Sequence, residues 1–321
     1  MRKPLVSVAI ITYNQVEFIA EAVRSAAEQD YDPLEVVVAD DGSTDGTADV
    51  VLQLAEQYPK RVIPLVGGPN LGITGNSNRA LAACRGKYVA FQGGDDVLLP
   101  RKISAQVEWL ERDERRVLCG HDVEVFDSAT GERLFLWSER FGLRRGKGAA
   151  PLVRRGVPFC ATAVMVRGSA IPASGFDERL AVVSDWKLWI DCLASGGQFG
   201  YVDGVYARYR RHEGNITNAY HEVRQDDQFV TLALVESRYP HLVSSCRRGR
   251  AELLRSAGTS AFRRGEIEFA RAYFLHALRQ ARRPFVRPLG GILLTLLPGR
   301  LAAGLVERFR PNTGTRALPR Q

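Results

Sequence analysis

The sequence predicts an α/β fold, with a mainly parallel sheet flanked by helices and a helical extension at the C-terminus. Short apolar runs rich in β-branched residues alternate with segments of helical spacing over residues 1–112. Strands that alternate with helices in this way are joined by right-handed crossovers, which places them in a parallel sheet. Polar clusters follow three of the strands, at the end where open α/β sheets bind ligands. The composition, 45% hydrophobic and 25% charged, is typical of a soluble globular protein.

Four strand–helix pairs account for the first 112 residues. Continuous apolar runs mark the buried strands, and apolar residues three and four positions apart mark the helices. No G-x-G-x-x-G motif follows the first strand, which argues against a dinucleotide-binding fold. The predicted strands are Leu5–Thr12, Leu34–Ala39, Val62–Val66 and Lys87–Phe91, and the helices run through Ile19–Ala26, Val51–Tyr58, Leu81–Arg85 and Ile103–Leu110.

The pattern becomes mixed after about residue 117 and helical after Asn215. One stretch, from Gly258 to Ala277, has the spacing of a single tetratricopeptide hairpin. Because one copy cannot form a solenoid, we expect a helical pair packed on the main domain. The predicted later elements are strands at His121–Phe126, Arg133–Trp137, Phe159–Val166, Phe199–Val202 and Val205–Tyr209, and a helix at Asp185–Ala194.

Positive charge is concentrated at the C-terminal end. Residues 241–321 hold 16 arginines, no lysine and four acids, a net charge of +12, which leaves −4 of the total +8 for residues 1–240. No helix-turn-helix or aromatic-rich strand accompanies this charge, so we expect no nucleic-acid partner. Leu289–Phe309 forms two amphipathic pieces, too short to span a bilayer. They fit either an interfacial helix or a terminal helix that closes the core.

These features predict a cytoplasmic protein that associates peripherally, through residues 286–321, with the inner face of a membrane. Anionic lipids attract such an arginine-rich segment. Five cysteines, odd in number and never in a C-x-x-C pair, indicate reduced thiols and argue against a zinc site. The basic N-terminus leads directly into the first strand, and we expect no signal peptide.

An acidic pair, Asp95 and Asp96, follows the fourth strand directly after Gly93 and Gly94. Adjacent carboxylates repel each other unless a cation lies between them, and Mg²⁺ or Mn²⁺ prefers such oxygen ligands. A cation at this place can hold a diphosphate. The alternative is a solvated turn that caps the next helix.

A second acidic cluster, Asp40-Asp41-Gly42-Ser43-Thr44-Asp45, follows the second strand. Asp45 is expected to cap the following helix. Capping does not explain the tandem pair Asp40 and Asp41. A carboxylate at a strand end can accept N–H groups from a base, and Tyr13 can stack on the ring. A nucleoside diphosphate fits both clusters: its base would meet Asp40 and Asp41, and its diphosphate would bind the cation at Asp95 and Asp96.

These motifs resemble a known family. Three segments of this chain resemble, in order and spacing, the nucleotide-binding half of family 2 glycosyltransferases of the GT-A fold. They are VSVAIITYN, VVVADDGSTDGT and NLGITGNSNRALAACRGKYVAFQGGDDVLLP. A weaker resemblance continues through GFDERLAVVSDWKLWI and RYRRHEGNIT to about residue 218. The resemblance implies a GT-A-type domain over 1–218, with a nucleotide-binding half at 1–112 and an acceptor half at 113–218. Residues 219–321 would form the basic helical extension.

The resemblance also implies a reaction. Family members transfer a sugar from a nucleotide donor with inversion, using a divalent metal. Here the donor would be UDP- or dTDP-linked and the acceptor a hydroxyl of a glycan or lipid-linked molecule, in cell-surface polysaccharide synthesis. Asp185 matches the catalytic base, and Asp95 and His212 match metal ligands. The implied nucleotide-binding residues are Thr12, Tyr13, Asn14, Asp41, Asn78, Arg79 and Asp95.

Two departures from the family pattern affect this interpretation. Gly93 stands where many relatives have a first metal-site acid, and Ser77 where many have an arginine near the diphosphate. Phosphate neutralisation is then left to the metal and Arg79. Alternative roles stay open: Asp185 as a helix cap and His212 as a surface histidine.

Two other functions for the whole chain also stay open. A sugar nucleotidyltransferase shares the α/β plan, but it needs a glycine- and lysine- or arginine-rich loop after the first strand, which Thr12–Glu17 lacks. A non-catalytic nucleotide-sugar-binding or scaffold protein would use the helical tail as its working part. Asp122 and Asp127, on the middle strands, are expected to be surface acids.

Overall fold

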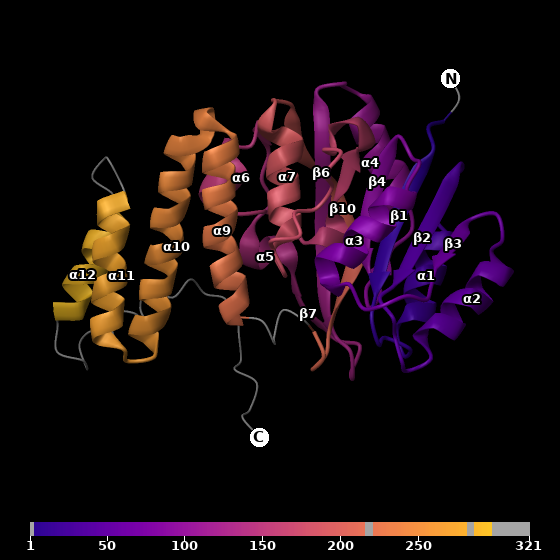
Figure 1. Cartoon of the computed structure of the whole chain (residues 1–321), viewed down its shortest axis with the longest axis horizontal. Helices are drawn as coiled ribbons and strands as arrows, with labels where there is room; N and C mark the ends of the chain where they lie inside the picture. Colours follow the sequence, from indigo (N-terminus) through magenta and orange to yellow (C-terminus); the bar gives the residue numbers. More distant parts are fainter. Residues whose placement is uncertain (1–2, 216–220, 281–285, 297–321) are drawn as a thin grey trace. The chain divides into compact units, whose positions relative to one another are not determined.

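A computed structural model describes residues 3–215, 221–280 and 286–296 (Figure 1). The chain forms two compact units. The first comprises residues 1–152 and 156–235, and the second residues 153–155 and 236–321. The predicted domain boundary between residues 218 and 219 lies outside the described residues.

The first unit is built on a ten-stranded sheet, in the order β3-β2-β1-β4-β9-β6-β10-β5, with β7 beside β6 and β8 beside β10. β3, β2, β1 and β4 are parallel neighbours, and β6 is parallel to β10. β9 runs antiparallel between β4 and β6. The predicted α/β fold with a mainly parallel sheet is therefore confirmed. The strands are β1 (Val6–Thr12), β2 (Leu34–Asp40), β3 (Val62–Leu65), β4 (Tyr88–Gly93), β5 (Val97–Leu98), β6 (Arg116–Asp127), β7 (Arg133–Leu136), β8 (Gly146–Lys147), β9 (Met165–Arg167) and β10 (Gln198–Arg211).

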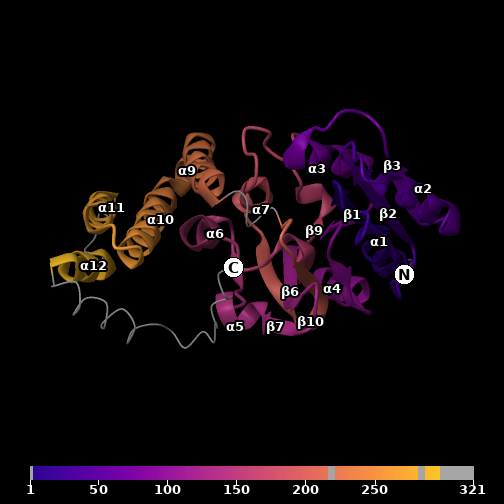
Figure 2. The same ribbon diagram turned by 90° about the horizontal axis from the view of Figure 1, so that it is seen from below.

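Helices cover both faces of this sheet. α3 and α7 lie on one face, and α1 and α4 on the other (Figure 2). Successive side chains of a strand point to opposite faces, so Phe91 of β4 packs against Trp189 of α7, with ring centroids 4.9 Å apart. Its neighbour Gln92 donates from Nε2 to the carbonyl oxygen of Ala22 in α1 (3.0 Å). The helices of this part are α1 (Ile19–Ala27), α2 (Thr47–Gln57), α3 (Gly72–Ala83), α4 (Lys102–Glu111), α5 (Trp137–Phe141), α6 (Ala150–Arg155) and α7 (Ser184–Ala194).

Two sequence predictions for the middle of the chain are wrong. The strand expected at Phe159–Val166 is only β9, preceded by a 3-10 turn at Ala161–Ala163. The two strands expected between Phe199 and Tyr209 are one strand, β10, which is bulged near Val202 and Val205. In the sequence, Gly204 between two apolar runs predicts a turn, but glycine is equally typical of a β-bulge within one strand.

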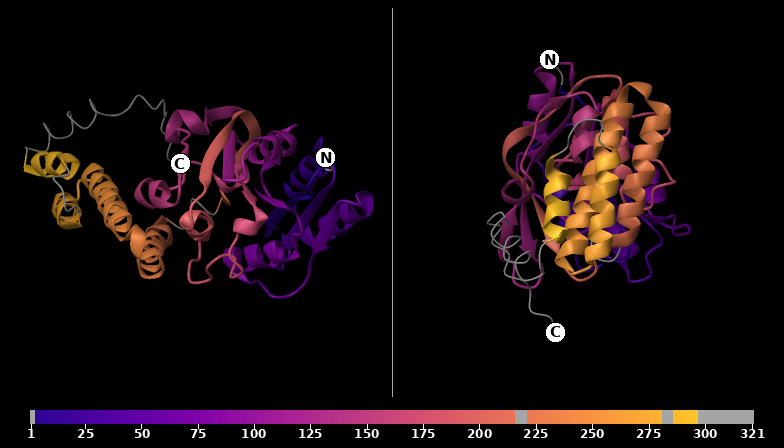
Figure 3. Two further views of the ribbon diagram at one scale, coloured as in Figure 1. Left: turned by 90° about the horizontal axis from the view of Figure 1, so that it is seen from above. Right: turned by 90° about the vertical axis from the view of Figure 1, so that its left-hand side faces the viewer.

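The helical pair predicted around Gly258 is confirmed in the second unit. α10 (Val243–Arg263) and α11 (Ile267–Gln280) pack around Ala261, Ala270 and Phe274. A Cβ at Gly258 would lie 2.8 Å from the Phe274 ring, so only glycine allows this close approach. α9 (His221–Arg238) begins in the first unit, and α12 (Val286–Leu296) follows α11. Figure 3 shows α10, α11 and α12 side by side. Among the described residues, no helix is long and apolar enough to span a membrane.

Lys102 and His121 are basic side chains that are fully buried in the first unit. Lys102 of α4 donates to Gln106 Oε1 (2.8 Å), and His121 of β6 lies against the Asp122 carbonyl oxygen with Nδ1 2.8 Å away. A carbonyl only accepts, so Nδ1 carries the proton, and Nε2 has no partner within the described chain. Burial, reinforced by the Lys102 charge, lowers the pKa of His121 to about 3. Burial likewise lowers the pKa of Lys102 to about 7.

We expect His121 to make folding pH-dependent. The unfolded chain takes up a proton near pH 6.5 while the folded imidazole stays neutral, so stability falls as pH drops below about 6.5. At pH 5 this histidine costs about 2 kcal/mol of unfolding free energy. Urea unfolding at pH 7 and pH 5 should show a smaller pH effect in His121→Gln than in the parent protein. The exposed His241→Gln is the control, and an unchanged pH effect in His121→Gln would contradict the prediction.

Candidate active site

The loops after β1 and β2 are tied together at the carboxyl edge of the sheet. Asp41 N donates to the Thr12 carbonyl oxygen (3.0 Å). Asn14, in the left-handed region with φ 50°, donates from its backbone N to Ser43 Oγ (2.8 Å) and accepts from Thr44 N at Oδ1 (2.9 Å). Tyr13 is 49% exposed between these contacts, which leaves its ring open to a planar ligand.

The acids of the second cluster have separate partners. Asp40, 1% exposed, accepts from the Ser43 backbone N (3.1 Å) and hydroxyl. Asp41, 4% exposed, accepts from Leu71 N at Oδ1 (2.7 Å). Asp45 accepts from Thr47 N (3.0 Å) at the start of α2, but the N-cap position is Gly46, so Asp45 is not the N-cap residue that we expected. Although burial opposes it, hydrogen bonds from Thr47 and Val16 lower the pKa of Asp45.

Asp95 and His212 meet although 117 residues separate them. Asp95 Oδ2 lies 3.0 Å from His212 Nε2. The imidazole also packs against the Phe18 ring, with centroids 4.8 Å apart. Asn215, 4% exposed, joins the pair: its Nδ2 lies 3.3 Å from Asp95 Oδ2, and its Oδ1 accepts from His212 N (2.7 Å). His212 is therefore held in place and is not an ordinary surface histidine.

Asp96 and Arg210 form the buried floor beneath this pair. Asp96 accepts from the Thr162 hydroxyl and from Arg210 N (3.1 Å). Burial, together with the neighbouring Asp95 charge, raises the pKa of Asp96 well above its ordinary value. The Arg210 guanidinium donates to the Asp95 carbonyl oxygen (2.8 Å) and to Glu21 Oε2 (2.5 Å). The positions of both acids are thus fixed by the end of β10.

Asp185 lies in the first turn of α7, which begins at Ser184. Its Oδ1 accepts from Trp186 N (2.6 Å). The N-cap position is Val183, so Asp185 is not the N-cap residue that the alternative interpretation required. Thr74 of α3 lies 3.0 Å from Ser184 Oγ. Because α3 starts at the carboxyl edge of β1 and β2, this contact places the start of α7 near the same edge.

Asn78 and Arg79 make contacts within the protein. The Asn78 amide donates to the Phe176 carbonyl oxygen (3.0 Å) and accepts from Phe176 N (2.7 Å). Arg79 donates to the carbonyl oxygens of Asp40 (3.0 Å) and Val66 (3.2 Å). Ser77 donates to the Ile73 carbonyl oxygen (2.7 Å). These bonds hold α3 and its loop in place.

Asp95 Oδ2 and His212 Nε2 are hydrogen-bonded to each other, and their spacing is also that of neighbouring ligands of a divalent cation. Neighbouring ligand atoms of an octahedral ion with bonds of about 2.1 Å lie about 3 Å apart, and Oδ2 and Nε2 are 3.0 Å apart. Among the described residues, no three histidine, cysteine, aspartate or glutamate side chains gather into a metal site. An ion held by two protein ligands would complete its shell with water and phosphate oxygens, which is how Mg²⁺ usually binds.

Comparison with known proteins agrees with this geometry. Residues 7–166 match the model of the glycosyl transferase family 2. An uncharacterized Mycobacterium tuberculosis protein is 32% identical over 225 residues, 68% of this chain and 62% of that protein. The chain belongs to glycosyl transferase family 2. The match spans less than two thirds of the length of the Mycobacterium tuberculosis protein.

One further relative and one solved structure are also similar to this chain. The Escherichia coli UDP-Glc:alpha-D-GlcNAc-diphosphoundecaprenol beta-1,3-glucosyltransferase WfaP is 27% identical, over 72% of this chain and 87% of WfaP. A solved structure of the Pyrobaculum calidifontis mannosyltransferase PcManGT, in complex with GDP-Man and Mn²⁺, has a TM-score of 0.59 at 20% identity. The match covers 96% of this chain and 88% of the PcManGT chain. This likeness confirms the GT-A fold.

Family motifs alone missed several residues that shape the site. Asn215 and Arg210 stand within the quoted RYRRHEGNIT segment, but nothing in the sequence shows that they reach Asp95. Thr162 gave no signal, because it stands in an apolar run. Asp122, expected at the surface, is 9% exposed and accepts from Ser138 N (2.9 Å), so that expectation is wrong. Helix α5, which carries Ser138, was not predicted.

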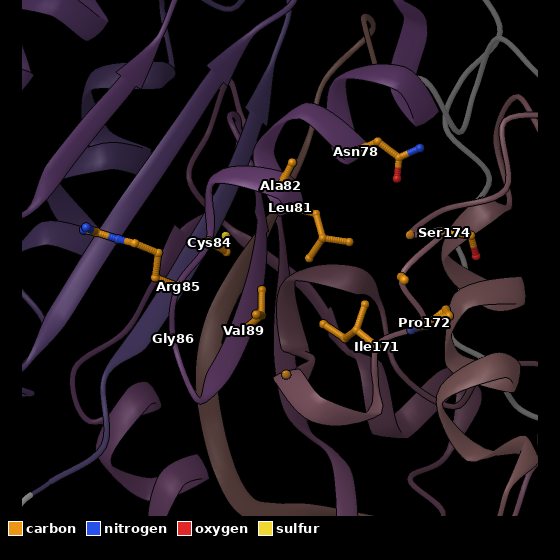
Figure 4. A pocket seen from close by; sticks show the side chains of 13 residues that line it. Asn78, Leu81, Ala82, Cys84, Arg85, Gly86, Val89, Ile171, Pro172 and Ser174 are labelled. Carbon is orange, nitrogen blue, oxygen red and sulfur yellow. The ribbon is translucent and has the colours of Figure 1, made fainter.

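A pocket of about 490 Å³ lies elsewhere, beside the C-terminal end of α3 and the start of β4 (Figure 4). Leu81, Val89 and Ile171 line it, and Arg85 extends away from its centre. Of the predicted site residues, only Asn78 lines this pocket. The pocket is therefore separate from the carboxyl edge that holds Asp95 and His212.

Proposed function

We propose that this family 2 protein is a metal-dependent inverting glycosyltransferase that moves a sugar from a nucleotide-sugar to an acceptor hydroxyl. The observation that carries the proposal is the Asp95–His212 pair, 3.0 Å apart at the carboxyl edge of the sheet. This edge is where an α/β sheet binds nucleotides. A sugar nucleotidyltransferase is less well supported, because the loop after β1 is held by Asn14 and has no basic residue.

The donor would bind across the ends of β1 and β2. Tyr13 is exposed for stacking on a base, and Asp41 has its Oδ1 engaged by Leu71 N. Its second oxygen is the acceptor that we assign to a base N–H. Thr12 and Asn14 hold the two loops together. WfaP is named for a UDP-sugar and PcManGT was solved with GDP-Man, and we assign a UDP- or dTDP-linked donor here.

Asp95 and His212 would hold Mg²⁺ or Mn²⁺ against the donor diphosphate. The ion, when bound, supplies positive charge that stabilises the leaving diphosphate. Asn215 bonds to the Asp95 carboxylate and to the His212 backbone, and Arg210 bonds to the Asp95 backbone, so both ligands are held before the donor arrives. Such preorganisation avoids a reorganisation cost during the reaction.

Asp185 would act as the general base. Its carboxylate takes the proton from the acceptor hydroxyl as that oxygen attacks the anomeric carbon and the bond to the diphosphate breaks. WfaP is named for a lipid-linked acceptor. We assign a glycan or lipid-linked acceptor to this chain, in the synthesis of a cell-surface polysaccharide.

Asp95→Asn should weaken donor binding only when metal is present. An amide replaces the charged oxygen ligand and lowers the affinity of the site for the ion. Titration calorimetry with UDP and GDP, with Mn²⁺ and with EDTA, measures this. We expect at least a tenfold loss in Mn²⁺ (about 1.4 kcal/mol) and little change in EDTA. Equal affinities of both proteins in Mn²⁺ would exclude Asp95 as a metal ligand.

Asp185→Asn should abolish most catalysis while sparing the fold and donor affinity. Asparagine keeps the size of the side chain and accepts the Trp186 N–H, but it cannot accept a proton. A general base contributes about 10²–10⁴-fold to rate, so we expect nucleoside diphosphate release to fall at least a hundredfold. The assay uses a panel of nucleotide-sugars in Mn²⁺ with water as the acceptor. Near-normal release by a folded variant would rule out this role.

We also propose that α12 and the arginine-rich end bind an anionic membrane surface. Leu293 and Leu296 of α12 are 64% and 63% exposed. An adjacent side of the helix packs within the second unit: Arg271 donates to the Thr295 carbonyl oxygen (3.1 Å), and Ile292 packs on the Phe274 cluster. Exposed leucines beside many arginines are typical of an interfacial helix. Residues 297–321 lie outside the described residues.

The double variant Leu293→Ser/Leu296→Ser should lose affinity for vesicles. It removes exposed apolar groups without touching the packed side of α12. Sedimentation with phosphatidylglycerol vesicles should show at least a tenfold loss, since each buried leucine contributes about 1.5–3 kcal/mol. Leu52→Ser, at a leucine 42% exposed on α2, is the matched control. Vesicle binding equal to that of the parent protein would refute the proposal.

A further inference from the structure

A carboxylate from α9 holds the loop that leads into α7. Asp227, 7% exposed, accepts at Oδ2 from Val182 N (2.7 Å) and from Val183 N (3.2 Å). We propose that Asp227 is a positioning residue that orients Asp185. The proposal rests on the proposed function, because it needs Asp185 to be the base.

The two bonds lie where α7 begins. Val183 is the N-cap residue, and its side chain caps nothing. Asp227 therefore places a buried negative charge beside the amino end of α7, where the helix dipole favours it. It also satisfies two backbone N–H groups that would otherwise lack a partner in a partly buried loop. The first turn, which carries Asp185, starts one residue later.

The same loop is held from its other side by α3. The Thr74 hydroxyl donates to the Leu180 carbonyl oxygen (2.5 Å) and lies 3.0 Å from Ser184 Oγ. Asp227 and Thr74 thus hold residues 180–184 between two helices. Removing the Asp227 carboxylate frees Val182 and Val183 and leaves the loop held from one side.

Small displacements of a base have large kinetic effects. A misplacement of 1 Å can cost about 10²-fold in rate. The donor residues on the β1, β2 and β4 loops have no hydrogen bond to Asp227 among the described residues. We therefore expect the loss of Asp227 to lower kcat and to spare donor affinity. Since Asp227 stands beyond residue 218, a chain cut at that point would lack it.

The test compares Asp227→Ala and Asp227→Asn with Asp226→Asn, which alters the adjacent, exposed acid. Nucleoside diphosphate release from nucleotide-sugars in Mn²⁺ gives kcat, and calorimetry with UDP gives donor affinity. We expect Asp227→Ala to lower kcat at least tenfold and to speed hydrogen exchange at the Val182 and Val183 amides. Asparagine still offers an acceptor oxygen, so Asp227→Asn should lose only several-fold. Asp226→Asn should behave as the parent protein.

A double-mutant cycle separates positioning from a general structural effect. If Asp227 acts through Asp185, Asp227→Ala costs nothing further in the Asp185→Asn background. An equal loss of kcat in both backgrounds, or no loss in the parent background, overturns the proposal. If Asp227→Ala does not fold, Asp227→Asn decides, and unchanged kcat overturns it. A full effect of Asp185→Asn with none from Asp227→Ala refutes only this inference, whereas no effect of Asp185→Asn refutes the proposed base itself.

Discussion

Three buried carboxylates at the carboxyl edge of the sheet impose the constraint on which the site depends. Asp40, Asp41 and Asp96 are 1%, 4% and 2% exposed. A buried carboxylate is costly unless hydrogen bonds satisfy it. The donors that satisfy these three come from four separate segments: Ser43, Leu71, Thr162 and Arg210. Folding the edge therefore requires those segments to converge, and their convergence builds the site.

The end of β10 contributes most to this convergence. Arg210 bonds to the backbone of Asp95 and to the side chain of Asp96, and Asn215 bonds to both Asp95 and His212. Asp95 and Asp96 stand in residues 1–112, whereas Thr162, Arg210 and Asn215, which hold them, stand in residues 113–218. The first half of the sequence alone therefore cannot form the Asp95–His212 pair. The loop before α7 likewise depends on a residue later in the chain, because Asp227 accepts a hydrogen bond from Val182 N.

Elements with a regular pattern of apolar residues were predicted from the sequence. Elements that depend on contacts between residues far apart in the chain were missed. β1, β2 and β4 were predictable because buried parallel strands are continuous apolar runs. α5 was missed, since five residues carry too little periodicity, and Ser138 is held there by Asp122. Asp95 and His212 were chosen from motifs, whereas Asn215 and Asp227 matter only because the chain brings them back to the site. A single sequence holds no signal for that return.

Charge balance at the edge is the physical reason for the proposed cation. Asp40, Asp41 and Asp95 gather at the strand ends, and a donor diphosphate would add more negative charge. Arg79 donates to two backbone carbonyl oxygens, and Arg210 to Asp95 and Glu21. With these guanidinium groups engaged and serine at position 77, like charges at short range would repel the donor. A divalent ion held by Asp95 and His212 would offset part of this negative charge, so the acids themselves favour the proposed metal dependence.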